Sequence, residues 1–171
     1  MLSYFVLILS IGFSCLGFAQ NASAIDFTIR NMGFNVEGRF ETYSITTQFN
    51  KNGNLDDLSA KIEVASIQTG IEARDQHLLE ADYFHAEKYK DIKLQSVLIT
   101  KKSDSSYLVK ATLRIKGITK TIIFPVQVEK HPHHYKITSN FELNRRDFDV
   151  GGGSFIMGKS VKVKVVYFQD L

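Results

Sequence analysis

Apolar and polar residues alternate one by one along most of this sequence, and a period of two is the pattern of a β-strand with one buried face. The segment VKVKVVYF near the end places Val161, Val163 and Val165 on one face and Lys162 and Lys164 on the other. The other alternating segments cover residues 25–29, 34–40, 43–49, 58–64, 92–98, 107–115, 122–128 and 135–143. The apolar face changes parity between the first two segments, which indicates a bulge or a tight bend. The pattern predicts a fold made mainly of antiparallel strands.

About eight strands are expected, mostly joined by short polar turns. A meander of this kind usually closes, because closure removes the exposed edges of the sheet. An eight-stranded barrel is filled by side chains or holds one small ligand. The length of 171 residues, with 44% hydrophobic and 23% charged residues, is typical of a single globular domain. A two-layer sandwich is the alternative fold, and the inward faces suit a solid core and a hollow interior equally well.

Residues 69–91 break the β pattern. Within them Ile71, Leu78 and Leu79 recur at the spacing of one helix face, and Phe84 follows in a second short turn. The sequence therefore predicts an amphipathic insertion between two strands. Its apolar residues are expected to be buried against the mouth or one wall of the barrel, as a lid.

The same insertion contains Arg74, Asp75 and His77, which invite a catalytic interpretation with His77 as base and Asp75 as its orienter. Residues so close together on a helix do not face each other, however, so this pair is badly placed for catalysis. No local pattern marks a serine or cysteine nucleophile. A structural role is favoured, in which these side chains bond to backbone or pair at the lid.

The segment GGGSFIMGKS, residues 151–160, matches the pattern of a phosphate-binding loop. Such a loop needs a helix after it, whose N-terminus holds the phosphates. Here Lys159 and Ser160 lead directly into an alternating β pattern, so we expect a glycine-rich loop before the last strand and no ATP site. The net charge of +3 is also too small and too scattered to predict nucleic-acid binding.

Three histidines, His131, His133 and His134, lie in a short turn with Pro132. Imidazoles so close together are able to hold Zn²⁺ or Cu²⁺. The turn position favours a solvated loop, and no carboxylate at helical spacing completes a ligand set. No metal or other cofactor is therefore predicted.

The first residues differ from the rest of the chain. Residues 2–18 carry no charge, and Gly17, Phe18 and Ala19 form the small-x-small pattern of a signal-peptidase site. We expect a signal peptide over residues 1–19, a domain over residues 20–171 and a periplasmic or secreted protein. An uncleaved membrane anchor is the alternative. The only cysteine, Cys15, lies in the predicted signal, so the exported chain would have no disulfide.

Several stretches resemble the YceI-like family. The longest is TGIEARDQHL at residues 69–78, followed by ADYF at 81–84 and EKY at 87–89. The others are FTIRN at residues 27–31, residues 33–40, LRIKGITK at 113–120 and NRRDF at 144–148. They occur in the family's order over nearly the whole predicted exported chain. His85 and Lys90 depart from the pattern, because members often carry Asp and Pro there.

The resemblance implies an exported bacterial protein with a lipocalin-like antiparallel eight-stranded β-barrel and a helical insertion over about residues 71–90. It also implies a binding protein that is not an enzyme and holds a long apolar chain, typically a polyisoprenoid, for transport, storage or sequestration. A packed barrel that acts as an interaction or stress-response module is the alternative, and a homodimer stays open. The expected ligand contacts are Phe27, Ile62, Val64, Ile71, Leu78, Leu79, Phe84, Leu94, Leu113, Phe124 and Phe141, with Arg74, Asp75 and His77 at the rim.

Overall fold

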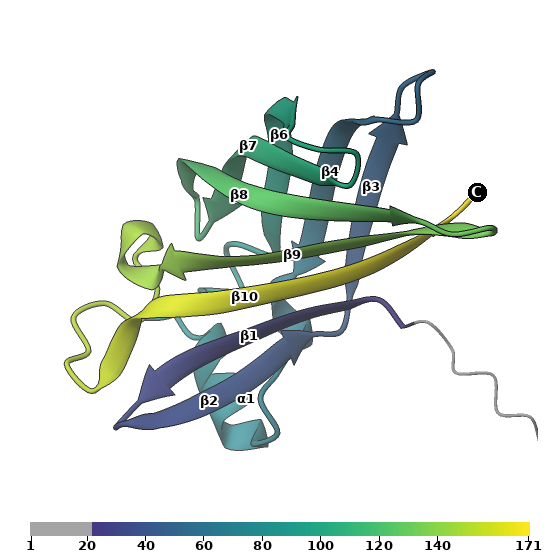
Figure 1. Cartoon of the computed structure of the whole chain (residues 1–171). Helices are drawn as coiled ribbons and strands as arrows, with labels where there is room; N and C mark the ends of the chain where they lie inside the picture. Colours follow the sequence, from purple (N-terminus) through teal and green to yellow (C-terminus); the bar gives the residue numbers. More distant parts are fainter. Residues whose placement is uncertain (1–21) are drawn as a thin grey trace, which may run out of the picture.

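The computed structural model describes residues 22–171, so the predicted signal peptide at residues 1–19 lies outside the described part. One antiparallel sheet of ten strands dominates it (Figure 1). The strands are β1 (Ala24–Asn31), β2 (Phe34–Phe40), β3 (Tyr43–Phe49), β4 (Leu55–Glu63), β5 (Ile67–Gln68), β6 (Asp91–Lys101), β7 (Ser106–Ile115), β8 (Ile118–Lys130), β9 (His134–Asn144) and β10 (Met157–Asp170). Two 3-10 helices, η1 (Val64–Ser66) and η2 (Arg145–Phe148), and the helix α1 (Glu72–Leu79) complete the fold.

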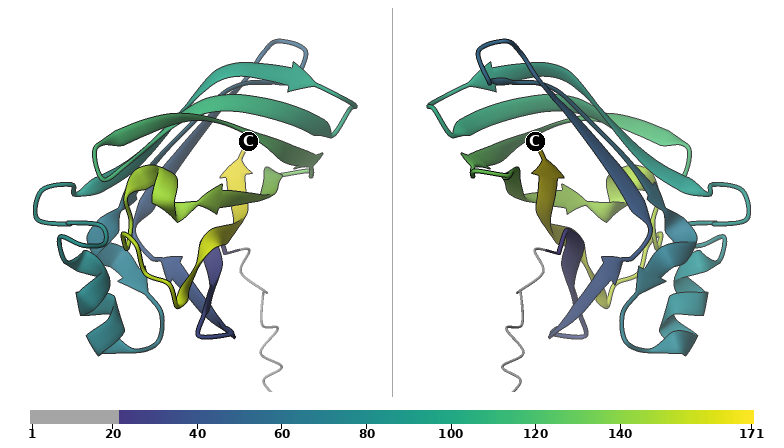
Figure 2. Two further views of the ribbon diagram at one scale, coloured as in Figure 1. Left: turned by 90° about the vertical axis from the view of Figure 1, so that its left-hand side faces the viewer. Right: turned by 90° about the vertical axis from the view of Figure 1, so that its right-hand side faces the viewer.

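The strands follow the order β3-β4-β6-β7-β8-β9-β10-β1-β2-β5, so β1 and β10 pair with each other inside the sheet rather than at its edges. Figure 2 shows how strongly the sheet curls. Within residues 22–171 the edge strands β3 and β5 do not pair with each other, and the sheet is a half-barrel. The mainly β, antiparallel fold with a helical insertion is therefore confirmed, whereas the number of strands and the closure differ from the expected eight-stranded barrel.

Two local features account for the extra strands. The change of parity near residues 31–33 is a hairpin turn between β1 and β2, in which Met32 and Gly33 both have positive φ, 50° and 86°. Two positive φ values in succession belong to the turn type that matches the twist of paired strands. The other addition is β5, which contributes two residues to the edge of β2.

The helical insertion lies where the sequence predicts it, with α1 followed by turns through residue 88. Leu78, Leu79 and Phe84 are partly buried against a core cluster that includes Phe40 and Ile67. The insertion therefore packs against the end of the curled sheet near β2 and β5 (Figure 1). Among residues 22–171, none of the helices has the length and apolarity needed to cross a membrane.

The concave side of the sheet carries the core in two clusters. One cluster centres on β7, β8 and β9, where Val109, Phe124 and Val126 are almost completely buried. The other lies under the insertion and includes Ile25 and Val64. The apolar sides of the alternating strands thus face one interior, as the period of two requires.

Candidate functional site

The interior of the curled sheet is not completely filled by side chains. A cavity of about 230 Å³ remains on the concave side. An apolar cavity of about 150 Å³ is already large enough to bind benzene in another protein. On β10 alternate residues from Val161 to Tyr167 line the cavity, a length of about 20 Å at 3.3 Å per residue, and Met157 at the start of the same strand lines it as well. The space is therefore long and narrow, and it suits an extended chain better than a compact molecule.

The walls of this cavity are almost entirely apolar. Of the 35 lining residues, six are Asn, Thr, Ser or Arg, two are Tyr, and the rest are apolar. Most of the long strands contribute alternate residues, for example Val161, Val163 and Val165 on β10. Asp, Glu, His, Lys and Cys are absent from the lining within the described part of the chain. Such walls favour hydrocarbon and offer no general base or thiol nucleophile.

The polar groups of the lining are mostly engaged by the protein itself. The Ser139 hydroxyl donates to the carbonyl of Pro125 at 2.6 Å, which satisfies it without a ligand. The side-chain oxygen of Asn31 is buried and finds no partner within residues 22–171. Asn31 is thus one of the few interior positions at which a ligand's hydrogen-bond donor would be stabilised.

Most of the predicted ligand contacts do line the cavity. They are Phe27, Ile62, Leu78, Phe84, Leu94, Leu113, Phe124 and Phe141. Val64 and Leu79 pack into the neighbouring core cluster instead and do not border the cavity. The alternation predicts Val64 on the inward face, but the strand ends at Glu63 and Val64 begins η1. Whether a ligand touches these residues stays a prediction.

The expected burial of Ile71 is wrong, because 54% of this residue is exposed. Ile71 precedes α1 as its N-cap residue and has extended backbone dihedrals, φ −134° and ψ 106°. The helix starts one residue later, so Ile71 does not share the face of Leu78. It lies outside both the lid contact and the cavity lining.

Arg74 and Asp75 tie the start of the insertion to the end of β5. The Asp75 carboxylate accepts the backbone N–H of Thr69 at 2.9 Å and also the Thr69 hydroxyl. Arg74 Nε donates to the same hydroxyl oxygen at 2.7 Å, and Nη2 donates to the Thr69 carbonyl at 2.6 Å. His77 pairs instead with Glu80, 2.9 Å away. These contacts are of the kind that the structural interpretation of Arg74, Asp75 and His77 expects, and Asp75 bonds to Thr69 rather than to His77. A purely structural role for the three residues stays a prediction.

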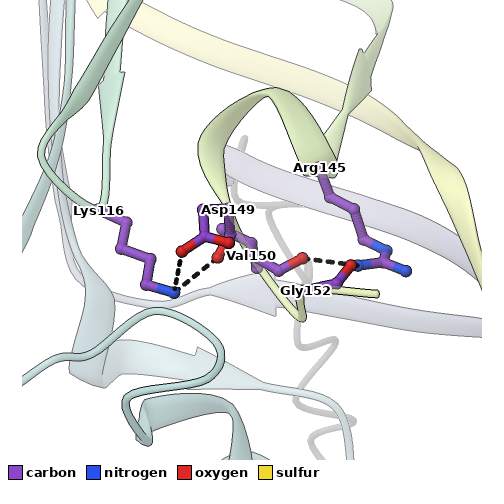
Figure 3. A network of polar contacts seen from close by, with 5 residues as sticks. All are labelled: Lys116, Arg145, Asp149, Val150 and Gly152. Carbon is purple, nitrogen blue, oxygen red and sulfur yellow. Dashed lines mark hydrogen bonds and ion pairs between the residues drawn. The ribbon is translucent and has the colours of Figure 1, made fainter. Parts of the chain in front are cut away.

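A second cationic side chain, Arg145 at the start of η2, also lines the cavity, and only 4% of the residue is exposed. Its five N–H groups donate to backbone carbonyls of the loop before β10 and of the start of β10. Figure 3 shows the bonds to Val150 and Gly152. The acceptors are Gly158 at 2.8 Å, Val150 at 2.7 Å, Gly152 at 3.3 Å, Ser154 at 3.2 Å and Met157 at 3.0 Å. Burial, together with the charge of Arg146, lowers the pKa of Arg145. Its donors are used by the protein, so Arg145 holds the loop rather than a ligand.

Lys116 ties the same loop to the turn between β7 and β8. Its ammonium group donates to the Asp149 carbonyl at 2.6 Å and lies 3.1 Å from the Asp149 carboxylate (Figure 3). Sequence reasoning missed both this contact and the role of Arg145, although Arg145 lies in the family-like stretch NRRDF. The acceptors are backbone carbonyls distant in sequence, which leave no side-chain pattern to read.

The other two sequence candidates lie away from the cavity. Lys159 and Ser160 belong to β10, and no helix follows the glycine-rich loop, which confirms the hairpin-type interpretation of GGGSFIMGKS. The rings of His131 and His134 stack at 4.7 Å between centroids in the turn from β8 to β9. Across residues 22–171, no group of three His, Cys, Asp or Glu side chains is placed to hold a metal ion.

Comparison with solved structures places the fold among known ones. The structure of BcnA from Burkholderia cenocepacia superimposes with a TM-score of 0.80 and 24% identity, covering 85% of this chain and 95% of BcnA. A polyisoprenoid binding domain from Saccharophagus degradans, implicated in plant cell wall breakdown, has a TM-score of 0.69 and 16% identity, covering 88% of this chain and 95% of that domain. At these identities the similarity shows a shared fold.

Sequence comparison gives the family. A UPF0312 protein from Photorhabdus laumondii is 30% identical over 106 residues, which are 61% of this chain and 55% of that protein. The match therefore spans about half of that relative's length. A UPF0312 protein from Staphylococcus aureus strain MSSA476 is 29% identical over 159 residues, 82% of this chain and 88% of the relative. The model of the YceI-like domain matches residues 18–167, and the chain therefore belongs to the YceI-like family.

Proposed function

We propose that this protein binds one long apolar chain, a polyisoprenoid or a similar lipid, in the cavity of the curled sheet, and that it holds the chain for transport, storage or sequestration. The observation that carries the proposal is the long lining, in which apolar side chains from β1, β4, β6, β7, β9 and β10 face one unfilled space. The polyisoprenoid binding domain from Saccharophagus degradans shares this fold and supports that class of ligand.

The driving force is sufficient for such a ligand. Burying hydrocarbon contributes about 0.8 kcal/mol per CH₂ group, so a chain of about 20 carbons gains roughly 16 kcal/mol. Association and ordering of the chain cost roughly 4–15 kcal/mol. The remainder is about 1–12 kcal/mol, and its upper half corresponds to micromolar or tighter binding, which allows retention during purification without any charged contact. Because the lining offers no acid–base pair or thiol, binding without chemical conversion of the chain is the activity we propose.

Native mass spectrometry of protein purified without detergent, followed by extraction of bound lipid, tests the proposal. Phe141 lines the cavity and stacks on Phe124 at 4.9 Å, whereas the adjacent Asn140 points outward and is exposed. Phe141→Arg should lower the lipid-bound fraction at least tenfold, because a buried unpaired charge opposes hydrocarbon. Asn140→Arg is the matched control and should retain the lipid.

Circular dichroism must show that both variants are folded. Equal lipid content in the folded wild-type protein and in both variants would overturn binding in the cavity. A wild-type protein free of lipid would favour the alternative of an interaction module that acts through its surface.

We also propose that the protein acts after export, in the periplasm or outside the cell. The proposal rests on the uncharged residues 2–18 and the cleavage pattern at Gly17, Phe18 and Ala19. Intact mass of native protein should correspond to a chain that begins at Gln20. Membrane-bound material that retains Met1 would contradict it.

A further inference from the structure

Two loops that lie next to each other at one end of the sheet expose four large apolar side chains. The turn from β1 to β2 carries Met32 and Phe34, which are 68% and 77% exposed. The loop before β10 carries Phe155 and Ile156, which are 100% and 62% exposed. A hydrogen bond of 2.9 Å from the Met32 N–H to the Ile156 carbonyl joins the loops. We call these four residues the apolar tip.

Both loops project beyond the body of the sheet at the same end (Figures 1 and 2). Neither contains an ionisable side chain over residues 31–36 and 150–158. Exposed large apolar residues that cluster in this way mark interaction surfaces rather than ordinary surface positions. Projecting apolar loops of this kind can insert into the interface of a lipid bilayer, whereas a flat sheet face is better suited to pack against another protein.

Basic residues surround the apolar tip. Arg30 precedes the first loop and donates to the Gly33 carbonyl at 3.1 Å. Lys159 follows the second loop and is exposed. Arg146 donates to the Ser154 carbonyl at 3.2 Å. Within residues 22–171, none of these three cations forms an ion pair, so their charges remain available to an external anion.

The apolar tip lies next to the cavity. Asn31 and Met157, each one position away from a tip residue, line the cavity wall. The loop itself is held by Arg145, which positions Phe155 outward without contact to the rest of the protein. A surface that receives the tip would thus lie against the end of the apolar interior.

We propose that the apolar tip is a docking site for the surface of an anionic lipid bilayer. The four apolar side chains enter the boundary between head groups and acyl chains, while Arg30, Arg146 and Lys159 contact anionic head groups. This surface is distinct from the cavity, and its test does not depend on the identity of the cavity ligand.

The chain contains no tryptophan, so a single introduced tryptophan reports on its own surroundings. We would compare Phe155→Trp with the control Ile123→Trp, which is 61% exposed on β8, away from the tip. The probe is a vesicle of phosphatidylglycerol with brominated acyl chains, with phosphatidylcholine vesicles as the uncharged comparison. Fluorescence of Phe155→Trp should shift to the blue and be quenched, and that of Ile123→Trp should not change.

Two further variants separate the apolar and electrostatic contributions. Phe34→Ser combined with Phe155→Ser should weaken vesicle binding at least tenfold, because both aromatic anchors are lost. Arg30→Gln combined with Lys159→Gln should weaken binding to phosphatidylglycerol by about fivefold per charge and leave the weaker binding to phosphatidylcholine unchanged.

Equal quenching of the two tryptophans, or no vesicle binding by the wild-type protein, would overturn the proposal. A concentration-dependent blue shift of Phe155→Trp without vesicles would assign the tip to self-association instead. Native mass spectrometry of the Phe34→Ser, Phe155→Ser protein distinguishes the two proposals. If this variant keeps lipid in the cavity but no longer binds vesicles, the tip is needed for docking and not for the cavity ligand. If the wild-type protein carries no lipid in its cavity, only the proposed cavity ligand is contradicted.

Discussion

Replacement of Arg145 by methionine is the sharpest test of how the loop before β10 is held. The substitution keeps much of the side-chain volume and removes five donors to backbone carbonyls. The Val150 carbonyl accepts the one fully buried bond of the five and would lose its partner, at a cost of about 1–3 kcal/mol. The other four acceptors are partly exposed and can bind water, so each loss costs about 0.5–1.5 kcal/mol.

One gain opposes these losses. The buried guanidinium has no carboxylate partner among the contacts of residues 22–171, and its lowered pKa reflects the cost of burying that charge. The losses together come to about 3–9 kcal/mol, with a midpoint of about 6 kcal/mol. Removing the incompletely compensated charge raises the free energy of unfolding by about 1–3 kcal/mol. From the midpoint, the net expectation is a loss of about 3–5 kcal/mol of unfolding free energy. For a domain of this size that corresponds to a fall in Tm of roughly 6–20 °C.

Urea denaturation followed by circular dichroism measures the loss. Arg145→Lys keeps the charge but offers three donors instead of five, so its stability should lie between those of wild type and Arg145→Met. Arg146→Met is the matched control, because the exposed Arg146 side chain makes one bond to this loop, and it should cost less than about 1 kcal/mol. Hydrogen exchange should increase first at residues 150–158. A cost below about 1 kcal/mol for Arg145→Met, or an equal cost for Arg146→Met, would refute the reasoning.

Two other predictions concern Tyr43 and Lys159. Burial, and to a smaller extent the charge of Asp26, raise the pKa of Tyr43 above 10.0, so the stability contributed by its neutral phenol is complete below about pH 10 and is lost as pH rises further. When pH rises from about 9 to about 11, the free energy of unfolding measured by urea denaturation should therefore fall less for Tyr43→Phe than for the wild-type protein. Lys159→Ala should leave unfolding free energy and lipid content nearly unchanged, and calorimetric ATP binding that this change abolishes would revive the phosphate-loop interpretation.

The strands could be predicted because their period of two depends only on which side chains must avoid water. The turn at Met32 was harder to recognise, because Met-Gly is not among the Asn-Gly or Asp-Gly pairs that usually mark two successive positive φ values. Val64 fits the alternation perfectly but begins η1, since periodicity does not reveal where a strand ends. Arg145 lies in the family-like stretch NRRDF, but the sequence does not reveal what it contacts, because its partners are carbonyl groups that every residue has.

Whether the interior is hollow depends on the sizes of side chains that meet only in the folded chain. One part of the concave side is filled by large rings, such as Phe49 stacked on Tyr135 at 4.1 Å between centroids. The inward face of β10 instead presents Val161, Val163 and Val165, whose short side chains reach less far across the curled sheet. In sequence both regions show the same alternation of apolar residues. Strand order and curvature decide which of these side chains meet across the interior, and so the sequence alone does not show where space remains.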